Sequence, residues 1–191
     1  CGDNGAAPSC YDFALGGAGQ HPSLPVGING GVIRAGTSIM VDITGNHNGY
    51  QSDCTRTFSA GRLPEKAYEA HHLSIAIQEE CARLGTPGTP CCELYGRALE
   101  LVEKAGLTEF FMGTAQQAKF IGHGLGIEIN ELPVISPRSQ TPLQEGMVIA
   151  LEPKFVLPGI GAVGTENTFA VTRQGLRRLT PAEQDLKDLS Q

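Results

Sequence analysis

The sequence has no cluster of lysine and arginine residues, no long apolar run and no C-x-x-C pair. Its net charge is −6, so we expect neither nucleic acid nor an anionic membrane as a partner. No apolar stretch approaches the ~20 residues that a membrane-spanning helix needs. Of its six cysteines, Cys91 and Cys92 are adjacent, which does not suit a disulfide framework. We therefore expect reduced thiols and a cytoplasmic protein.

What is present is a globular composition. Hydrophobic residues make up 40% and charged residues 18% of 191 residues, which suits one domain over residues 1–191. The chain starts at Cys1 rather than at a methionine, so we expect a fragment or a processed product.

Hydrophobic periodicity and turn residues predict strands near both ends of the chain with helices between them. The expected elements are strands at 37–44 and 50–58, helices within 63–85 and 89–106, strands at 119–130, 147–157 and 161–172, and a late helix from Pro181. In the second helix, Thr89 is the expected N-cap. This order predicts an α+β fold, with one antiparallel sheet backed by helices.

The first two strands predict a hairpin that presents a pair of carboxylates. With residues 46–49 as a four-residue loop, Asp42 lies opposite Asp53. Opposite residues share a sheet face with Cβ atoms ~5 Å apart. Ile39, Val41 and Ile43 take the other face. Two like charges at that separation require a positive charge between them.

A second hairpin repeats the arrangement near the end of the chain. If Pro158, Gly159 and Ile160 form its loop, Leu157 lies opposite Gly161. Counting back along both strands then places Glu152 opposite Glu166.

His123 lies in a glycine-rich strand, G-H-G-L-G, that leaves room for close approach. One imidazole and four carboxylates gathered together require balancing charge, which two divalent ions supply. Oxygen ligands with one nitrogen suit Mn, Co, Fe or Zn. Taken singly, a residue of each of these types is more often an ordinary core or surface group than a metal ligand. Two hairpins that come independently into register favour the metal interpretation.

These residues carry a resemblance to a known family. The segments VDITGNHNGYQSDCTRTF, FIGHGLGIEINELP, EGMVIALEPKF and GAVGTENTFAVT resemble the four metal-site segments of the pita-bread metallopeptidases: methionine aminopeptidase, aminopeptidase P and prolidase. The match covers nearly all of the chain. It implies the pita-bread fold without its first helices, a C-terminal position in a longer protein, and a homodimer when full length.

The resemblance also implies roles for individual residues. Asp42 is a terminal ligand of one metal, Asp53 and Glu166 bridge both, and His123 and Glu152 hold the second. Glu152 also moves the proton of the attacking water.

Two further residues are candidates for substrate contact. Asn130 stands where much of the family has a second histidine, seven residues after the ligand histidine. An amide can donate a hydrogen bond but cannot transfer a proton, which puts the activity in question. His21 lies about where relatives place a substrate-binding histidine.

The resulting hypothesis is a two-metal hydrolase that cleaves an N-terminal peptide bond of the Xaa-Pro type, with His123, Asn130, Glu152 and His21 as catalytic candidates. One alternative is a non-catalytic binding module of the same fold, since Asn130 departs from the pattern. Another is a metal-dependent hydrolase of a small non-peptide amide.

Overall fold

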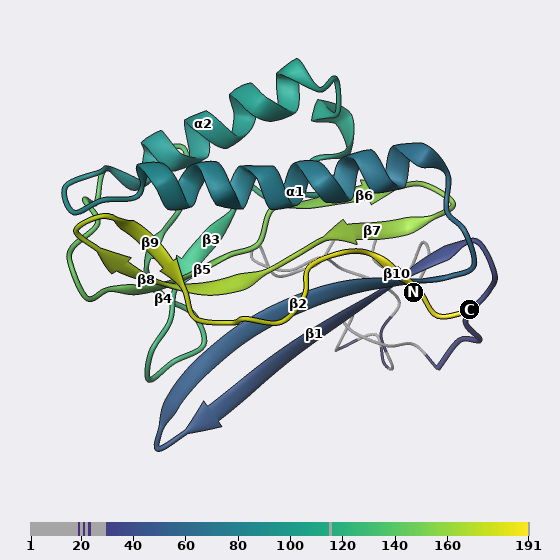
Figure 1. Ribbon diagram of the computed structural model, residues 1–191, viewed down its shortest axis with the longest axis horizontal. Helices are drawn as coiled ribbons and strands as arrows, with labels where there is room; N and C mark the ends of the chain where they lie inside the picture. The colour runs from purple at the N-terminus through teal and green to yellow at the C-terminus, as the bar shows by residue number, and fades with distance from the viewer. Residues whose placement is uncertain (1–18, 20, 22, 24–29, 115, 191) are drawn as a thin grey trace.

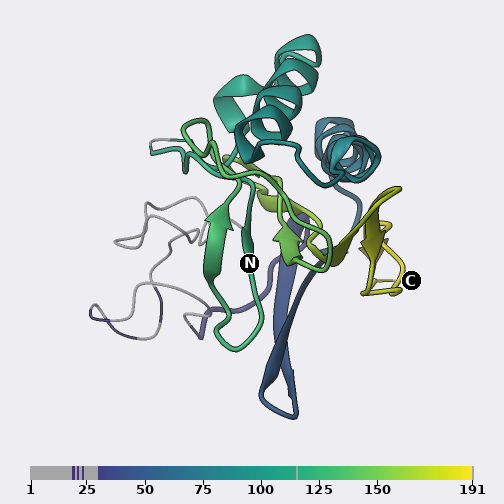
Figure 2. The same ribbon diagram turned by 90° about the vertical axis from the view of Figure 1, so that its left-hand side faces the viewer.

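The computed structural model describes residues 19, 21, 23, 30–114 and 116–190 (Figure 1). Two helices lie together on one side of the strands, and the first hairpin extends away from them (Figure 2). The elements are β1 (Thr37–His47), β2 (Tyr50–Ala60), α1 (Glu65–Leu84), α2 (Cys91–Lys104), the 3-10 helix η2 (Thr108–Phe110), β3 (Gly122–Gly124), β4 (Glu131–Val134), β5 (Val148–Leu151), β6 (Lys154–Leu157), β7 (Gly161–Gly164), β8 (Asn167–Thr172), β9 (Gly175–Arg178) and β10 (Lys187–Asp188). The predicted α+β class is confirmed.

The strands of the described residues form three sheets rather than the one expected. Their orders are β1-β2-β10, β4-β3-β5-β8-β9 and β6-β7. The sheets are connected because β5 continues into β6 and β7 continues into β8. Helix α1 packs over β6, β7 and β9, and α2 packs against α1. The hydrophobic core lies between these helices and the strands.

The first hairpin has a different register from the predicted one. Asp42 lies opposite Thr55, and Asp53 lies opposite Thr44. The loop is the two-residue turn Asn48–Gly49, in which both residues have positive φ. Asn-Gly is a strong signal for such a turn, and it fixes the register. The error is two residues, so Asp42 and Asp53 still share one face of the hairpin.

The second hairpin has the predicted register. Leu157 lies opposite Gly161 at its end, and Lys154 lies opposite Gly164. The same count continues beyond the sheet break, where Leu151 pairs with Asn167. Glu152 lies between β5 and β6, and Glu166 lies between β7 and β8, so both residues are in the break between the two sheets.

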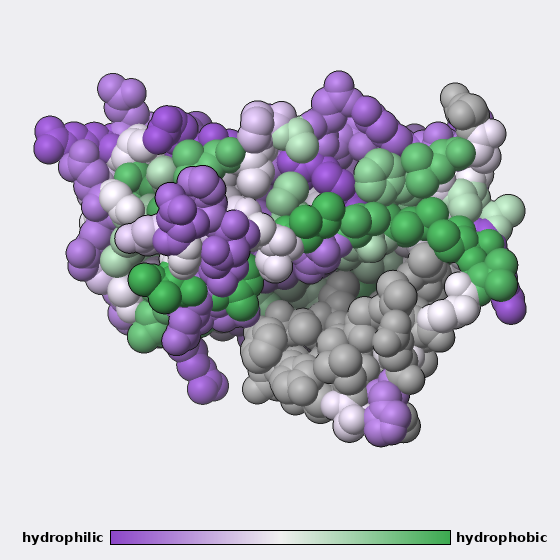
Figure 3. Space-filling view, turned by 90° about the horizontal axis from the view of Figure 1, so that it is seen from below, coloured by the Kyte–Doolittle hydropathy of each residue, from purple (hydrophilic) through white to green (hydrophobic). Residues whose placement is uncertain are grey.

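The inward face of β2 is polar yet buried. It carries Asp53, Thr55, Thr57 and Ser59, all 7% exposed or less. The Thr57 hydroxyl donates to the Gly164 carbonyl at 2.6 Å, which ties β2 to β7. On the apolar face of β1, by contrast, Ile43 is 61% exposed. Figure 3, which views the molecule from below, shows a band of hydrophobic residues on that face.

Both predicted central helices are present, but their details differ. The N-cap of α2 is Pro90, because the first helix amides pair with backbone carbonyls of the 139–141 segment. Thr89 instead donates to the Leu84 carbonyl at the end of α1. In α1, burial departs from hydrophobic character, since Ala76 is exposed while Gln78 is buried.

The late helix expected from Pro181 is wrong. Residues 181–186 have no helix, and the short strand β10 follows them and pairs in parallel with β2. The segment is held instead by Arg56, which donates to the carbonyls of Ala182 and Glu183. No helix among the described residues has the length and apolar character to cross a bilayer. Cys54, Cys81, Cys91 and Cys92 are free thiols.

Candidate metal centre

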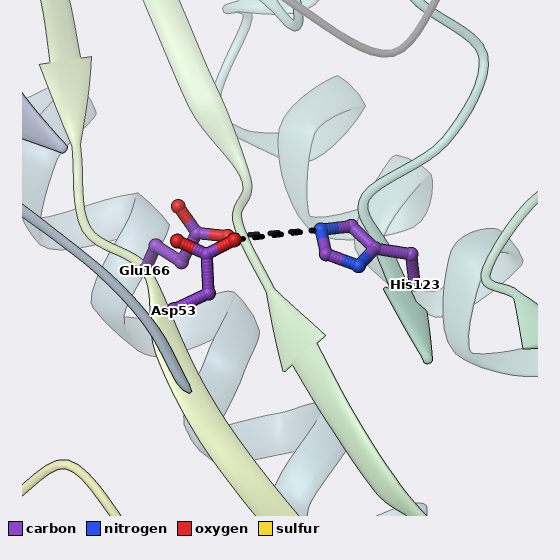
Figure 4. Close-up of side chains that lie close together, drawn as sticks. All are labelled: Asp53, His123 and Glu166. Atoms are coloured by element: carbon purple, nitrogen blue, oxygen red, sulfur yellow. Dashed lines mark ion pairs between the residues drawn. The ribbon is translucent and has the colours of Figure 1, made fainter. Parts of the chain in front are cut away.

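Four buried side chains from separate parts of the chain meet below α1. Asp53 comes from β2, His123 from β3, and Glu152 and Glu166 from the break between the sheets. The His123 Nε2 atom lies 3.3 Å from Glu152 Oε1 and 4.0 Å from both Asp53 Oδ2 and Glu166 Oε1. Figure 4 shows the Asp53 and Glu166 carboxylates side by side, facing the His123 ring.

The glycines around His123 allow close contact between strands. A Cβ on Gly122 would lie 2.2 Å from the Ala150 carbonyl oxygen, and one on Gly124 would lie 2.4 Å from that of Leu132. The His123 Nδ1–H donates to the Gly124 carbonyl at 3.0 Å. This bond turns Nε2 toward the carboxylates, the orientation of a metal-ligating histidine.

Glu166 is positioned by β2. The Thr55 hydroxyl donates to Glu166 Oε2 at 2.7 Å, and the Glu166 amide donates to the Thr55 carbonyl at 3.1 Å. The side chain is 2% exposed. Burial raises the pKa of Glu166 to about 8, and the negative charge of Glu152 adds to this shift. Such a carboxylate is destabilised in its charged form unless a cation accompanies it.

The other buried groups have shifted pKa values as well. Burial raises the pKa of Asp53 to about 6, helped by the charges of Asp42 and Glu152. Burial by itself lowers the pKa of His123, but its hydrogen bond to Glu152 raises it to about 9. For Glu152, burial opposes ionisation, while Lys154 and His123 lower its pKa below the usual range.

Lys154 is the site residue that the sequence reasoning missed. It is 6% exposed, and its ammonium lies 2.7 Å from Glu152 Oε2 and 3.7 Å from Glu166 Oε2. Burial lowers its pKa, but the charges of Glu152 and Glu166 raise it well above the usual value. The available signal was a lysine at the start of the apolar run K-F-V-L, two residues after an expected ligand.

The donor set fits a divalent ion. One ligand atom each from Asp53, His123 and Glu166 lie within 4.8 Å of one another. The Asp53 Oδ1 atom is buried, and within the described residues it has no hydrogen-bond partner. A buried carboxylate oxygen without a donor is costly, and a cation removes that cost. Oxygen donors with one imidazole suit a first-row divalent metal.

The remaining candidates lie farther out. Asp42 is exposed, although its charge reaches Asp53 and Glu166. Asn130 is exposed and lies in a loop, because the predicted strand 119–130 ends at Gly124.

The loop that carries Asn130 leads directly into β4. The next residue, Glu131, pairs with Gly124, so the chain comes back beside the end of β3. His21 is exposed and forms a 2.6 Å hydrogen bond with Ser23. The substrate roles of Asn130 and His21 stay predictions.

Known proteins are similar to this chain in sequence and in fold. A model of metallopeptidase family M24 matches residues 3–173. The Xaa-Pro dipeptidase of Pyrococcus furiosus is 34% identical over 184 residues, which is 96% of this chain and 51% of that protein. The prolidase from Pyrococcus horikoshii OT3 has a TM-score of 0.78 and 30% identity, covering 97% of this chain and 47% of that one. The X-Pro aminopeptidase from Thermotoga maritima MSB8 has a TM-score of 0.73 and 28% identity, covering 81% and 42%.

The arrangement of sheets and helices is thus the pita-bread fold of the prolidases and aminopeptidases. The chain belongs to metallopeptidase family M24, whose members depend on divalent metals. It spans about half the length of the curated relatives that it matches.

Proposed function

We propose that this chain carries the catalytic site of a divalent-metal-dependent hydrolase that cleaves Xaa-Pro bonds at the N-terminus of a peptide or in a dipeptide. The observation that carries the proposal is the meeting of one imidazole with three buried carboxylates, one of which has an oxygen, Asp53 Oδ1, that finds no hydrogen-bond partner among the described residues. The relatives named Xaa-Pro dipeptidase and prolidase support this substrate class.

The proposed metal ligands are those of the family resemblance: Asp42, Asp53, His123, Glu152 and Glu166. The resemblance implies two ions of Mn, Co, Fe or Zn, and this number stays a prediction. A bound divalent ion polarises a carbonyl group and makes a water molecule more acidic.

The chain's own residues handle the proton and the substrate. Lys154 donates a 2.7 Å hydrogen bond to Glu152 and favours its carboxylate form. An ionised Glu152 accepts a proton from the attacking water. Asn130, on the loop that returns beside β3, donates a hydrogen bond to the substrate carbonyl. A homodimer and a cytoplasmic location also stay predictions.

The test is metal content together with turnover of Xaa-Pro dipeptides, on protein reconstituted with Mn or Co. Asp53→Ala is the variant, and Asp185→Ala is its control, because Asp185 is exposed and outside the centre. We expect wild type and Asp185→Ala to bind metal and turn over, and Asp53→Ala to lose both. Bound metal with turnover of small amides alone would favour the small-amide hydrolase. Protein that neither binds metal nor turns over any substrate would be a binding module.

A further inference from the structure

Lys154 is unusual because its charged end is buried inside the candidate centre. Lysine is almost never fully buried unless it is paired. Its side chain leaves the first residue of β6, opposite Gly164, where a Cβ would lie 3.1 Å from the Lys154 Cα. The backbones of β6 and β7 are therefore close together at this position. The Lys154 ammonium lies beside the carboxylates of Glu152 and Glu166.

The carboxylate oxygens of the centre divide into two groups. Glu152 Oε1 and Glu166 Oε1 face the His123 ring. Glu152 Oε2 and Glu166 Oε2 face the Lys154 ammonium. Glu166 Oε2 also accepts the hydroxyl of Thr55. A carboxylate that bridges two ions uses one oxygen for each, and here the second oxygen of Glu166 already has two partners.

Charge balance leads to the same conclusion. The buried carboxylates are Asp53, Glu152 and Glu166, with three negative charges when ionised. One divalent ion and the Lys154 ammonium neutralise them. Asp42 adds a fourth negative charge, since it is exposed but its charge still acts on Lys154 and Glu166. Even with Asp42 counted, two divalent ions and the Lys154 ammonium would bring five positive charges against four negative ones in a largely buried site.

We propose that the Lys154 ammonium takes the place of one of the two divalent ions, so that the centre binds a single ion tightly through Asp53, His123, Glu152 and Glu166. The inference rests on the proposed function, since it concerns the same metal centre. Lys154 is a positioning residue, which fixes the outer oxygens of Glu152 and Glu166 and sets the number of ions bound.

The experiment measures bound Mn²⁺ by equilibrium dialysis and elemental analysis, with electron paramagnetic resonance as a second readout. Wild type is expected to hold about one tightly bound Mn²⁺ per chain, and Lys154→Met about two, since methionine has similar length and no charge. Wild type should give the hyperfine pattern of an isolated Mn²⁺, and Lys154→Met that of a spin-coupled pair. Lys154→Arg keeps the charge and should stay near one ion.

Lys187→Met is the matched control, because Lys187 is exposed and pairs with Glu183 outside the centre. It should bind as wild type does. Two tightly bound ions in wild type, or an unchanged single ion in folded Lys154→Met, would overturn the inference and leave the proposed function intact. Lys154→Gln replaces Lys154→Met if the latter does not fold. A wild-type protein that binds no Mn²⁺ would instead remove the proposed function.

Discussion

Gly122 lies so close to Ala150 that a side chain on Gly122 would overlap the Ala150 carbonyl oxygen, at 2.2 Å. The Gly122→Ala change would therefore push β3 away from β5 and displace His123. We expect a loss of roughly 3 kcal/mol of unfolding free energy, since backbone cannot move aside as a flexible side chain does. Urea unfolding of the metal-free protein measures this loss.

Gly96→Ala is the control for that change. Gly96 is in α2, and a Cβ there meets nothing within 4 Å. Alanine in a helix interior should raise the free energy of unfolding by roughly 0.5–1 kcal/mol. Equal effects of the two changes would contradict the close approach of β3 and β5.

Thr55→Val should weaken the support of Glu166. The change keeps the shape of the side chain but removes the hydroxyl that donates to Glu166 Oε2. Leaving one partner of a buried hydrogen bond unpaired costs roughly 1–3 kcal/mol. Thermal unfolding should show a lower Tm for Thr55→Val, whereas Thr44→Val, at an exposed position, should unfold like wild type. The same Tm in both variants would show that this bond adds nothing to stability.

Arg56→Met should release the segment after β9. The guanidinium donates to the carbonyls of Ala182, Glu183 and Glu166, and to Asn167 Oδ1. Its removal deletes hydrogen bonds to two exposed and two partly buried acceptors, so we expect a loss of about 2 kcal/mol. Limited proteolysis followed by mass spectrometry should detect faster cleavage near residues 181–186. Cleavage at the wild-type rate would contradict the anchoring role.

Asn130→His tests the departure from the family pattern. A histidine there could donate a proton as well as a hydrogen bond, and positioned acids typically contribute ~10²–10⁴ in rate. If Xaa-Pro peptides are the substrates, kcat should rise while Mn²⁺ content stays the same. A fall in kcat would indicate that the site is adapted to Asn130 and to a different leaving group.

Mn²⁺ affinity should increase with pH between about 6 and 9. The raised pKa values are about 6 for Asp53, about 8 for Glu166 and about 9 for His123, so the last two groups hold protons at pH 7. A metal ion must displace those protons, so its binding releases them and strengthens as the pH rises. Calorimetry in buffers of different ionisation enthalpy measures the release. Affinity that is constant over this range would contradict the shifted values.

The sequence predicted most of what depends on local pattern. The α+β class, both central helices and the strands near 37–58 and 147–172 follow from periodicity and turn residues, whereas the expected strand 119–130 is present only as Gly122–Gly124. The first hairpin differs from the predicted register by two residues because the Asn48–Gly49 turn, rather than a four-residue loop, connects its strands. Asp42 and Asp53 still lie on the same sheet face, because side chains alternate between faces and a shift of two residues returns each to its original face.

Features that depend on contacts between distant segments could not be predicted in this way. Helix α1 buries Ser74 and Gln78 because their side chains donate to the carbonyls of Pro153 and Thr165, where the sheets break. Hydrophobic periodicity along the sequence instead predicts that these two polar residues are exposed. Lys154 was missed for the same reason, since its partners become visible only when both hairpin strands are in place.

The distance along the chain between Asp53 and Glu166 has a consequence for synthesis. The residues that meet at His123 come from β2, β3 and the break between the sheets, so the complete site cannot exist until Glu166 has left the ribosome. An ion captured earlier could meet only part of its ligands. Loading of the metal must therefore follow the folding step that brings Glu166 to His123.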